Sequence, residues 1–142
     1  MEEKIYGVLL TFSPAACSTI LRFLKDTETK ADDYDAIYTG DLGIVGSQLL
    51  IELAQKEGYD LSKRHKDFGK MIYDIKKQDV HAGGSGCGCS ASMMASYIMQ
   101  QMNSGKLKNI LYCATGALLS PTSVLQGESI PSICHLINIC RS

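Results

Sequence analysis

The feature that most constrains this chain is residues 82–105, which carry no charge although 20% of the whole sequence is Asp, Glu, Lys or Arg. The stretch opens with the glycine-rich run AGGSGCGC and continues as SASMMASYIMQQM, which mixes small with large apolar side chains. The pattern predicts a helix over residues 87–102, ended by Asn103, Ser104 and Gly105. A helix without a charged face is normally buried all round, so we expect this one between two layers of the fold.

The glycine-rich run does not match a nucleotide or metal motif. A dinucleotide fingerprint requires G-x-G-x-x-G, but counted from Gly84 its third glycine position holds Cys89. A Walker A loop requires a lysine, which the run lacks. Cys87 and Cys89 form C-x-C instead of the C-x-x-C of zinc sites, and His81 does not complete a ligand set. We therefore expect neither a cofactor nor a resident metal.

Three interpretations of the run stay open. Glycines let a loop approach another segment closely, so close packing is the interpretation that we favour. A ligand held by the backbone N–H groups at the helix start is the second. The third is a nucleophile, here Cys87 or Cys89, because the positive end of the helix dipole lowers the pKa of a thiol placed there.

The remainder of the chain alternates between strand-like and helix-like segments. Ser13 and Pro14 are typical of a helix start, and a second helix is predicted from Leu42 to Gly58. Strands connected through such helices form a mainly parallel sheet, and a last strand reached without a helix is expected to be antiparallel. The predicted strands are residues 5–12, 34–38, 71–73, 109–114 and 132–139.

Composition bounds the class of protein. A chain of 142 residues with 45% hydrophobic side chains is expected to form one domain over residues 1–142, and a net charge of −1 gives no basis for binding nucleic acid. The six cysteines lack the spacing of a disulfide scaffold, so we expect reduced thiols. No apolar run is long enough for a membrane span, which predicts a soluble, otherwise cytoplasmic chain.

The basic residues and two of the histidines give weaker signals. Lys63, Arg64 and Lys66 are expected to form a solvated face, with His65 exposed among them. His135 alternates with isoleucines in the last predicted strand. It is expected to be a hydrogen-bonded core histidine and not a base.

The chain resembles the stage V sporulation protein AD family of the thiolase-like superfamily in three segments, in order YDAIYTGDLGIVGSQLL, GGSGCGCSASMMASYIMQQM and ILYCATGALLSPTSVLQGESIPSICHLINI. The resemblance covers about residues 13–139 and corresponds to the C-terminal half of that family, whereas residues 1–12 match poorly. It implies an α/β thiolase-like half, with a mixed, mainly parallel five-stranded sheet, helices on both faces and a buried central helix. The chain is then expected to pair with the N-terminal half or to form a homodimer.

The resemblance also implies that the chemistry of the superfamily is lost. Its enzymes place a histidine in one loop of this half and a histidine or asparagine at the mouth of the central helix, where this chain has Asp41 and Ser85. Neither residue can act as an imidazole base, and a carboxylate would repel a developing oxyanion. The implied ligand pocket is lined by Gly84, Ser85, Gly86 and Cys87, with His81 and Asp41 at its rim.

The family is associated with the SpoVA membrane complex, which moves dipicolinic acid as its calcium chelate into the developing spore. The resemblance therefore implies a non-enzymatic subunit that binds dipicolinate or its calcium chelate, contacts other SpoVA subunits and associates peripherally with the spore inner membrane. The alternative is a thiolase-type acyltransferase or condensing enzyme with Cys87 or Cys89 as nucleophile. A third hypothesis is a folded remnant without activity of its own.

Overall fold

The computed structural model describes residues 2–84, 86–117, 122, 125–127 and 131–141, with residues 2–11 given by their backbone only. These residues contain a four-stranded sheet in the order β2-β1-β3-β4. β1 (Ala36–Thr39) is parallel to β2 (His65–Asp67) and to β3 (Asn109–Ala117). β4 (Ser132–Cys140) is antiparallel to β3, as the sequence predicts.

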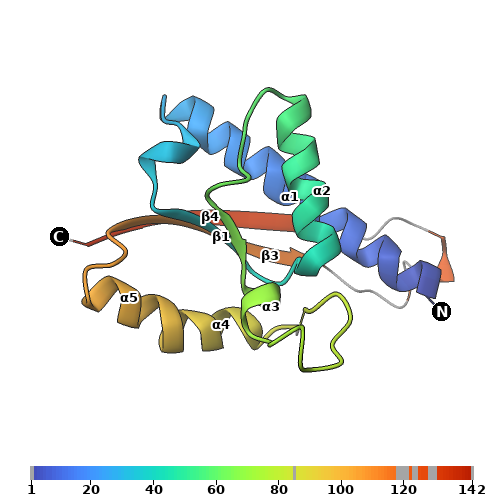
Figure 1. The fold of residues 1–142 in the computed structure, drawn as a ribbon. Coiled ribbons are helices and arrows are strands. Elements are labelled where there is room, and N and C mark those ends of the chain that lie inside the picture. Colours follow the sequence, from blue (N-terminus) through green and yellow to red (C-terminus); the bar gives the residue numbers. More distant parts are fainter. Residues whose placement is uncertain (1, 85, 118–121, 123–124, 128–130, 142) are drawn as a thin grey trace.

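Helices cover both faces of the sheet (Figure 1). On one face lie α1 (Glu2–Asp26) and α2 (Gly43–Lys56), which share a core with β3 and β4. The other face is covered by α3 and by a segment of three consecutive helical pieces, which we call the central helix. The α/β class with helices on both faces is confirmed. On this second face α3 spans Phe68–Met71, and the central helix consists of α4 (Cys89–Met93), the π-helix η2 (Met94–Ile98) and α5 (Met99–Asn103). A 3-10 turn, η1 (Ala31–Asp33), precedes β1.

The sheet has four strands among the described residues and not the expected five, because two strand predictions are wrong. Residues 5–12 belong to α1. The apolar run there continues without a break into the predicted helix, and periodicity does not separate a buried strand from a helix over so few residues. Met71 is the last residue of α3 and residues 72–73 follow it, whereas the strand of this region is β2, inside the basic run.

Ser13 and Pro14 lie inside α1 and do not start it. Ser13 is fully buried, and its hydroxyl donates to the Gly46 carbonyl of α2 at 2.9 Å. A Cβ on Gly46 would lie 3.2 Å from that hydroxyl oxygen, so the two helices cross in close contact here. The side chain that resembles an N-cap is therefore used to join α1 to α2.

The central helix is buried on one face only in this chain, which corrects the expectation of burial all round. Its buried residues are Cys89, Met93, Ile98 and Met102, while Met99 is 47% exposed. These buried positions are separated by four, five and four residues, and the interval of five coincides with η2. The wider π turn therefore keeps one apolar face on the sheet along the whole helix.

Two histidines are placed opposite to their predictions. His65 is in β2 and only partly exposed, whereas Lys63 and Lys66 beside it are exposed as expected. His135 is exposed on β4. The reason is that the His65 imidazole contacts the Thr39 hydroxyl of β1, whereas His135 lies on a face of β4 on which Ile133 and Ile137 are also exposed.

The glycine-rich run packs closely against two other turns, as the favoured interpretation predicts. The Ala82 carbonyl accepts from the Ile44 N–H at 2.7 Å, and the Gly69 carbonyl accepts from the Gly84 N–H at 3.0 Å. A Cβ on Gly83 would lie 2.5 Å from the Gly69 oxygen, and the φ of Gly83 is +78°. Only glycine fits this position without strain.

A buried chain of hydrogen bonds runs from β2 into β1 and the starts of two helices. The Asp67 carboxylate accepts from the Thr39 hydroxyl at 2.6 Å, from the N–H groups of Leu42 and Gly43 at 2.9 Å each, and from the Lys70 N–H at 3.2 Å. His65 Nε2 lies 2.9 Å from the same Thr39 oxygen. Since the Thr39 hydroxyl donates its proton to Asp67, its oxygen is the acceptor toward His65. The imidazole therefore carries a proton on Nε2.

Replacement of Gly83 by alanine is expected to lower the free energy of unfolding by about 2–4 kcal/mol, because the methyl group meets the Gly69 carbonyl at a positive φ. Gly88→Ala is the matched control, since φ there is −83° and no atom lies within 4 Å of an added Cβ. Its effect should stay below about 0.5 kcal/mol. Urea denaturation measures both variants, and equal stabilities would contradict the role given to Gly83.

The pH dependence of stability is expected to report on His65. Burial lowers the pKa of His65 to about 4 from its ordinary 6.5. Between these values the unfolded chain binds more protons, so the free energy of unfolding should rise by about 2–3 kcal/mol as the pH rises through this window. His65→Gln should remove most of that rise, and His135→Gln, on an exposed side chain, should not. Parallel profiles for all three proteins would show that His65 is not the group responsible.

Candidate functional site

The site predicted at the glycine-rich run lies where the carboxyl ends of β1 and β3 meet the start of the central helix (Figure 1). Gly40 and Asp41 follow β1, Thr115 is near the end of β3, and Gly86 precedes α4. Ligands of open α/β sheets bind at this edge, because the loops that leave the strands there are free to form a crevice. The location is therefore one at which α/β proteins place binding sites.

Asp41 is held by two donors from separate segments. The Thr115 hydroxyl donates to its Oδ1 at 3.3 Å, and the Gly86 N–H also donates to the carboxyl group. Partial burial raises the pKa of Asp41, although both hydrogen bonds act in the opposite direction. The carboxyl group thus takes up a proton more readily than an exposed aspartate does.

The base of the site is tightly packed around Gly40. A Cβ there would lie 2.8 Å from the Thr115 hydroxyl oxygen and 3.1 Å from that of Ser90. The Gly40 carbonyl accepts from the Cys89 thiol at 3.8 Å, and Cys89 is 2% exposed. Cys89 is accordingly part of the packing under the site, which leaves its thiol little access to a substrate.

The other predicted site residues are placed differently from one another. Gly84 adjoins Asp41, since an added Cβ would be 4.0 Å from the Asp41 carbonyl oxygen. Cys87 is exposed, and His81 is an exposed residue whose Nδ1 lies 3.7 Å from the Asp79 carboxylate. The structure therefore brings Asp41 together with Gly84 and Gly86, whereas His81 faces solvent beside Asp79. Ser85 lies outside the described residues.

Sequence reasoning did not identify Thr115 and Ser90 as members of this site. Thr115 directly follows the strand predicted over residues 109–114. This position at a strand end is the one signal in the sequence that pointed to it. Ser90 lies in a run of small residues, where no pattern distinguishes it. Only the pairing of β1 with β3 brings Thr115 beside Asp41.

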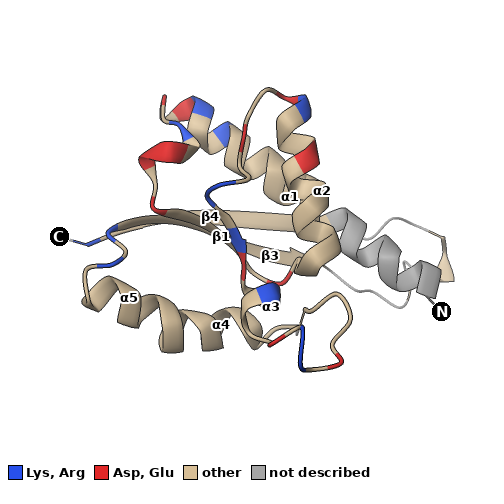
Figure 2. Cartoon of the chain, viewed as in Figure 1, with Lys and Arg blue, Asp and Glu red and all other residues tan. Residues whose placement is uncertain are grey.

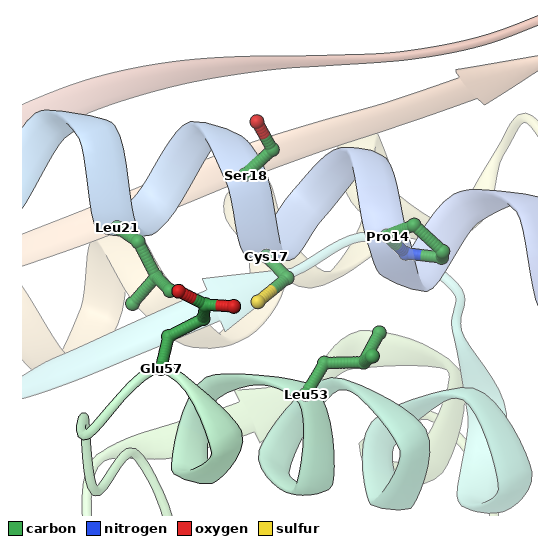
Figure 3. A pocket seen from close by; sticks show the side chains of 6 residues that line it. All are labelled: Pro14, Cys17, Ser18, Leu21, Leu53 and Glu57. Atoms are coloured by element: carbon green, nitrogen blue, oxygen red, sulfur yellow. The ribbon is translucent and has the colours of Figure 1, made fainter.

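A separate cavity of about 380 Å³ lies between α1 and α2 and contains a thiol (Figure 3). Cys17 of α1 and Glu57, just after α2, point toward one another in it. Burial raises the pKa of Cys17, and the negative charge of Glu57 raises it further. This thiol stays protonated and is a poor nucleophile.

Three further properties of the described part of the chain bear on its function. Its His, Cys, Asp and Glu side chains form no group of three that could hold a metal ion. None of its helices is long and apolar enough to cross a membrane. None of the six cysteines, all of which are described, forms a disulfide.

Known proteins provide an independent comparison. The family profile described as Stage V sporulation protein AD (SpoVAD) matches residues 7–140. A curated relative, the Stage V sporulation protein AD of Bacillus subtilis (strain 168), is 48% identical over 123 residues, which are 87% of this chain and 36% of the relative. The chain thus spans little more than a third of the length of that relative. Because the family profile matches nearly all of its residues, the chain belongs to the stage V sporulation protein AD family.

Proposed function

We propose that this sporulation protein is a non-enzymatic subunit that binds the calcium chelate of dipicolinate at the glycine-rich loop, in contact with the SpoVA complex at the spore inner membrane. The observation that carries the proposal is the Asp41 carboxyl group, fixed between Gly86 and Thr115 at the carboxyl edge of the sheet. Family membership supports the biological setting.

The charge of Asp41 favours the chelate over free dipicolinate. Dipicolinate is a dianion, and a third carboxylate beside it would be repelled unless a cation or a proton lies between them. Calcium takes about six to eight oxygen ligands, so a chelating dipicolinate leaves positions that a protein carboxylate and backbone carbonyls fill. Asp41 supplies such a carboxylate at the edge of the sheet.

The turn next to Asp41 is open enough for a flat ring. Gly86 and Gly88 are exposed, and no atom lies within 4 Å of a Cβ added to either. Exposed backbone N–H groups at a helix start attract carboxylates. Cys87, between these two glycines, and His81, beside Asp79, are both exposed, so their side chains are available to contact the rim of a bound ligand.

The assembly role is supported by an uncharged surface on the central helix. Figure 2 shows that α4 and α5 carry no Lys, Arg, Asp or Glu. Met99 is 47% exposed on this helix, and Ile133 and Ile137 of β4 are 54% and 52% exposed. Exposed apolar surface of this kind is typical of protein interfaces. It suits the remaining part of a full-length family member or a second copy of this chain.

Calorimetric titration is expected to show binding of dipicolinate with equimolar calcium, and weaker binding of dipicolinate in the presence of a calcium chelator. Asp41→Asn should weaken binding of the chelate about tenfold, or about 1.4 kcal/mol, by removing a charged ligand. The same change should leave the affinity for free dipicolinate equal or higher, because it removes a repulsive charge.

The matched control is Glu52→Gln, which removes one negative charge from the exposed side of α2. Its chelate affinity should equal that of the parent chain. Absence of heat with either form of dipicolinate, for a chain shown to be folded by circular dichroism, would exclude the proposal. Equal losses in the Asp41 and Glu52 variants would reduce it to a general effect of charge.

A further inference from the structure

Two buried thiols meet across β3 and β4, outside the site at Asp41. In the strand register Cys113 lies opposite Leu136 and Cys134 opposite Thr115. The two cysteines are therefore diagonal neighbours, on the face of the sheet that α1 covers. Their side chains are hydrogen-bonded to each other. Such a pair is chemically competent for more than packing, since two adjacent thiols hold two transferable electrons.

A surface cavity of about 380 Å³ gives access to one member of this pair. Its walls come from α1 and β4, and Cys134 lines it while Cys113 does not. Cys134 is 7% exposed, and Cys113 is fully buried at 0%. A small polar oxidant therefore reaches Cys134 first. The residues that line the cavity with Cys134 are Ser18, Thr19, Arg22, Phe23, Asp26, His135 and Leu136.

The environment also makes the two thiols unequal. The hydrogen bond from Cys113 lowers the pKa of Cys134, and the same bond, with burial, raises the pKa of Cys113. The thiolate is the form that attacks a peroxide. The pKa of Cys17 is shifted in the opposite direction to that of Cys134, because burial and Glu57 both raise it. Among these three thiols Cys134 is the one prepared for oxidation.

We propose that Cys134 and Cys113 form a hydroperoxide-sensitive pair that closes reversibly to a disulfide. The Cys134 thiolate attacks one peroxide oxygen, the O–O bond breaks, and the leaving oxygen takes a proton to become water or an alcohol. Cys134 is then a sulfenic acid. The Cys113 sulfur attacks the Cys134 sulfur, the S–O bond breaks, and the Cys113 proton leaves with the hydroxyl as water. The two thiols lose two electrons, which reduce the peroxide.

The position of the pair in the sheet favours a reversible bond. The Cα atoms of diagonal neighbours on antiparallel strands are about 7–8 Å apart, above the limit of about 6.8 Å that a disulfide usually spans, so the bond requires one strand to move toward the other. β4 is an edge strand of the sheet and, among the described residues, pairs with β3 alone. Its Cys134 carbonyl is held by the Thr19 hydroxyl of α1 at 3.1 Å, so the shift would be felt at the α1 contact. A strained disulfide is readily reduced again.

The test uses Cys87→Ser/Cys140→Ser, which removes the two exposed cysteines and their intermolecular reactions. After brief treatment with hydrogen peroxide, free thiols are alkylated and the unfolded chain is cleaved after its lysines and arginines and after its glutamates, which puts Cys17, Cys89, Cys113 and Cys134 on four separate peptides. We expect the peptides that contain Cys113 and Cys134 to be joined, the mass of the chain to fall by two hydrogen atoms, and dithiothreitol to restore both. Cys17 should be recovered as a free thiol.

Two single replacements in this background distinguish the order of the steps. With Cys113→Ser, dimedone should trap a sulfenic acid at Cys134 and no crosslink should form. With Cys134→Ser, peroxide consumption should fall at least tenfold and Cys113 should stay reduced. An uncrosslinked chain after oxidation, or a Cys134 that reacts no faster than Cys17, would overturn the proposal. The peptide mapping needs no change at either cysteine, so its result does not depend on how these replacements fold.

Discussion

The structure depends first on the Asp67 carboxylate, which is buried and joins four segments. It accepts from Thr39 in β1, from the N–H groups that begin α2, and from the first turn of α3, while its own backbone belongs to β2. A buried carboxylate is stable only when it is hydrogen-bonded, so these four elements must meet at one point. This meeting point places the turn after β1, and therefore Asp41, at the edge of the sheet.

The glycine-rich loop adds a second constraint to the same edge. Gly83 and Gly84 dock on the Gly69 turn that Asp67 caps, and the Ala82 carbonyl accepts from the first turn of α2. Because these contacts lie between backbones, side chains are excluded and the loop has one path. That path brings the Gly86 N–H to the Asp41 carboxyl group. The ligand interpretation and the close-packing interpretation of the run are thus compatible, since packing of its first half positions its second half.

The cysteines show how one residue type is given different chemistry by its neighbours. Cys89 packs under the site. Burial and the Glu57 carboxylate raise the pKa of Cys17 and keep it protonated, whereas the Cys113 thiol lowers the pKa of Cys134. None of these differences follows from spacing in the sequence, because each partner comes from another element. The proposed redox pair and the proposed binding site share β3, through Cys113 and Thr115.

The sequence by itself determined the α/β class, the antiparallel last strand, the central helix and the family. These follow from local periodicity, from glycine and from long segments in a fixed order, which one chain displays without its fold. Only the tertiary structure decided that residues 5–12 are helical, that Ser13 joins two helices, and that His65 is partly buried beside Thr39. The tertiary structure also brought Thr115 beside Asp41 and Cys134 beside Cys113. These outcomes depend on contacts between residues that are far apart in the chain, and the strength of each contact depends on how deeply it is buried. No local sequence pattern contains that information.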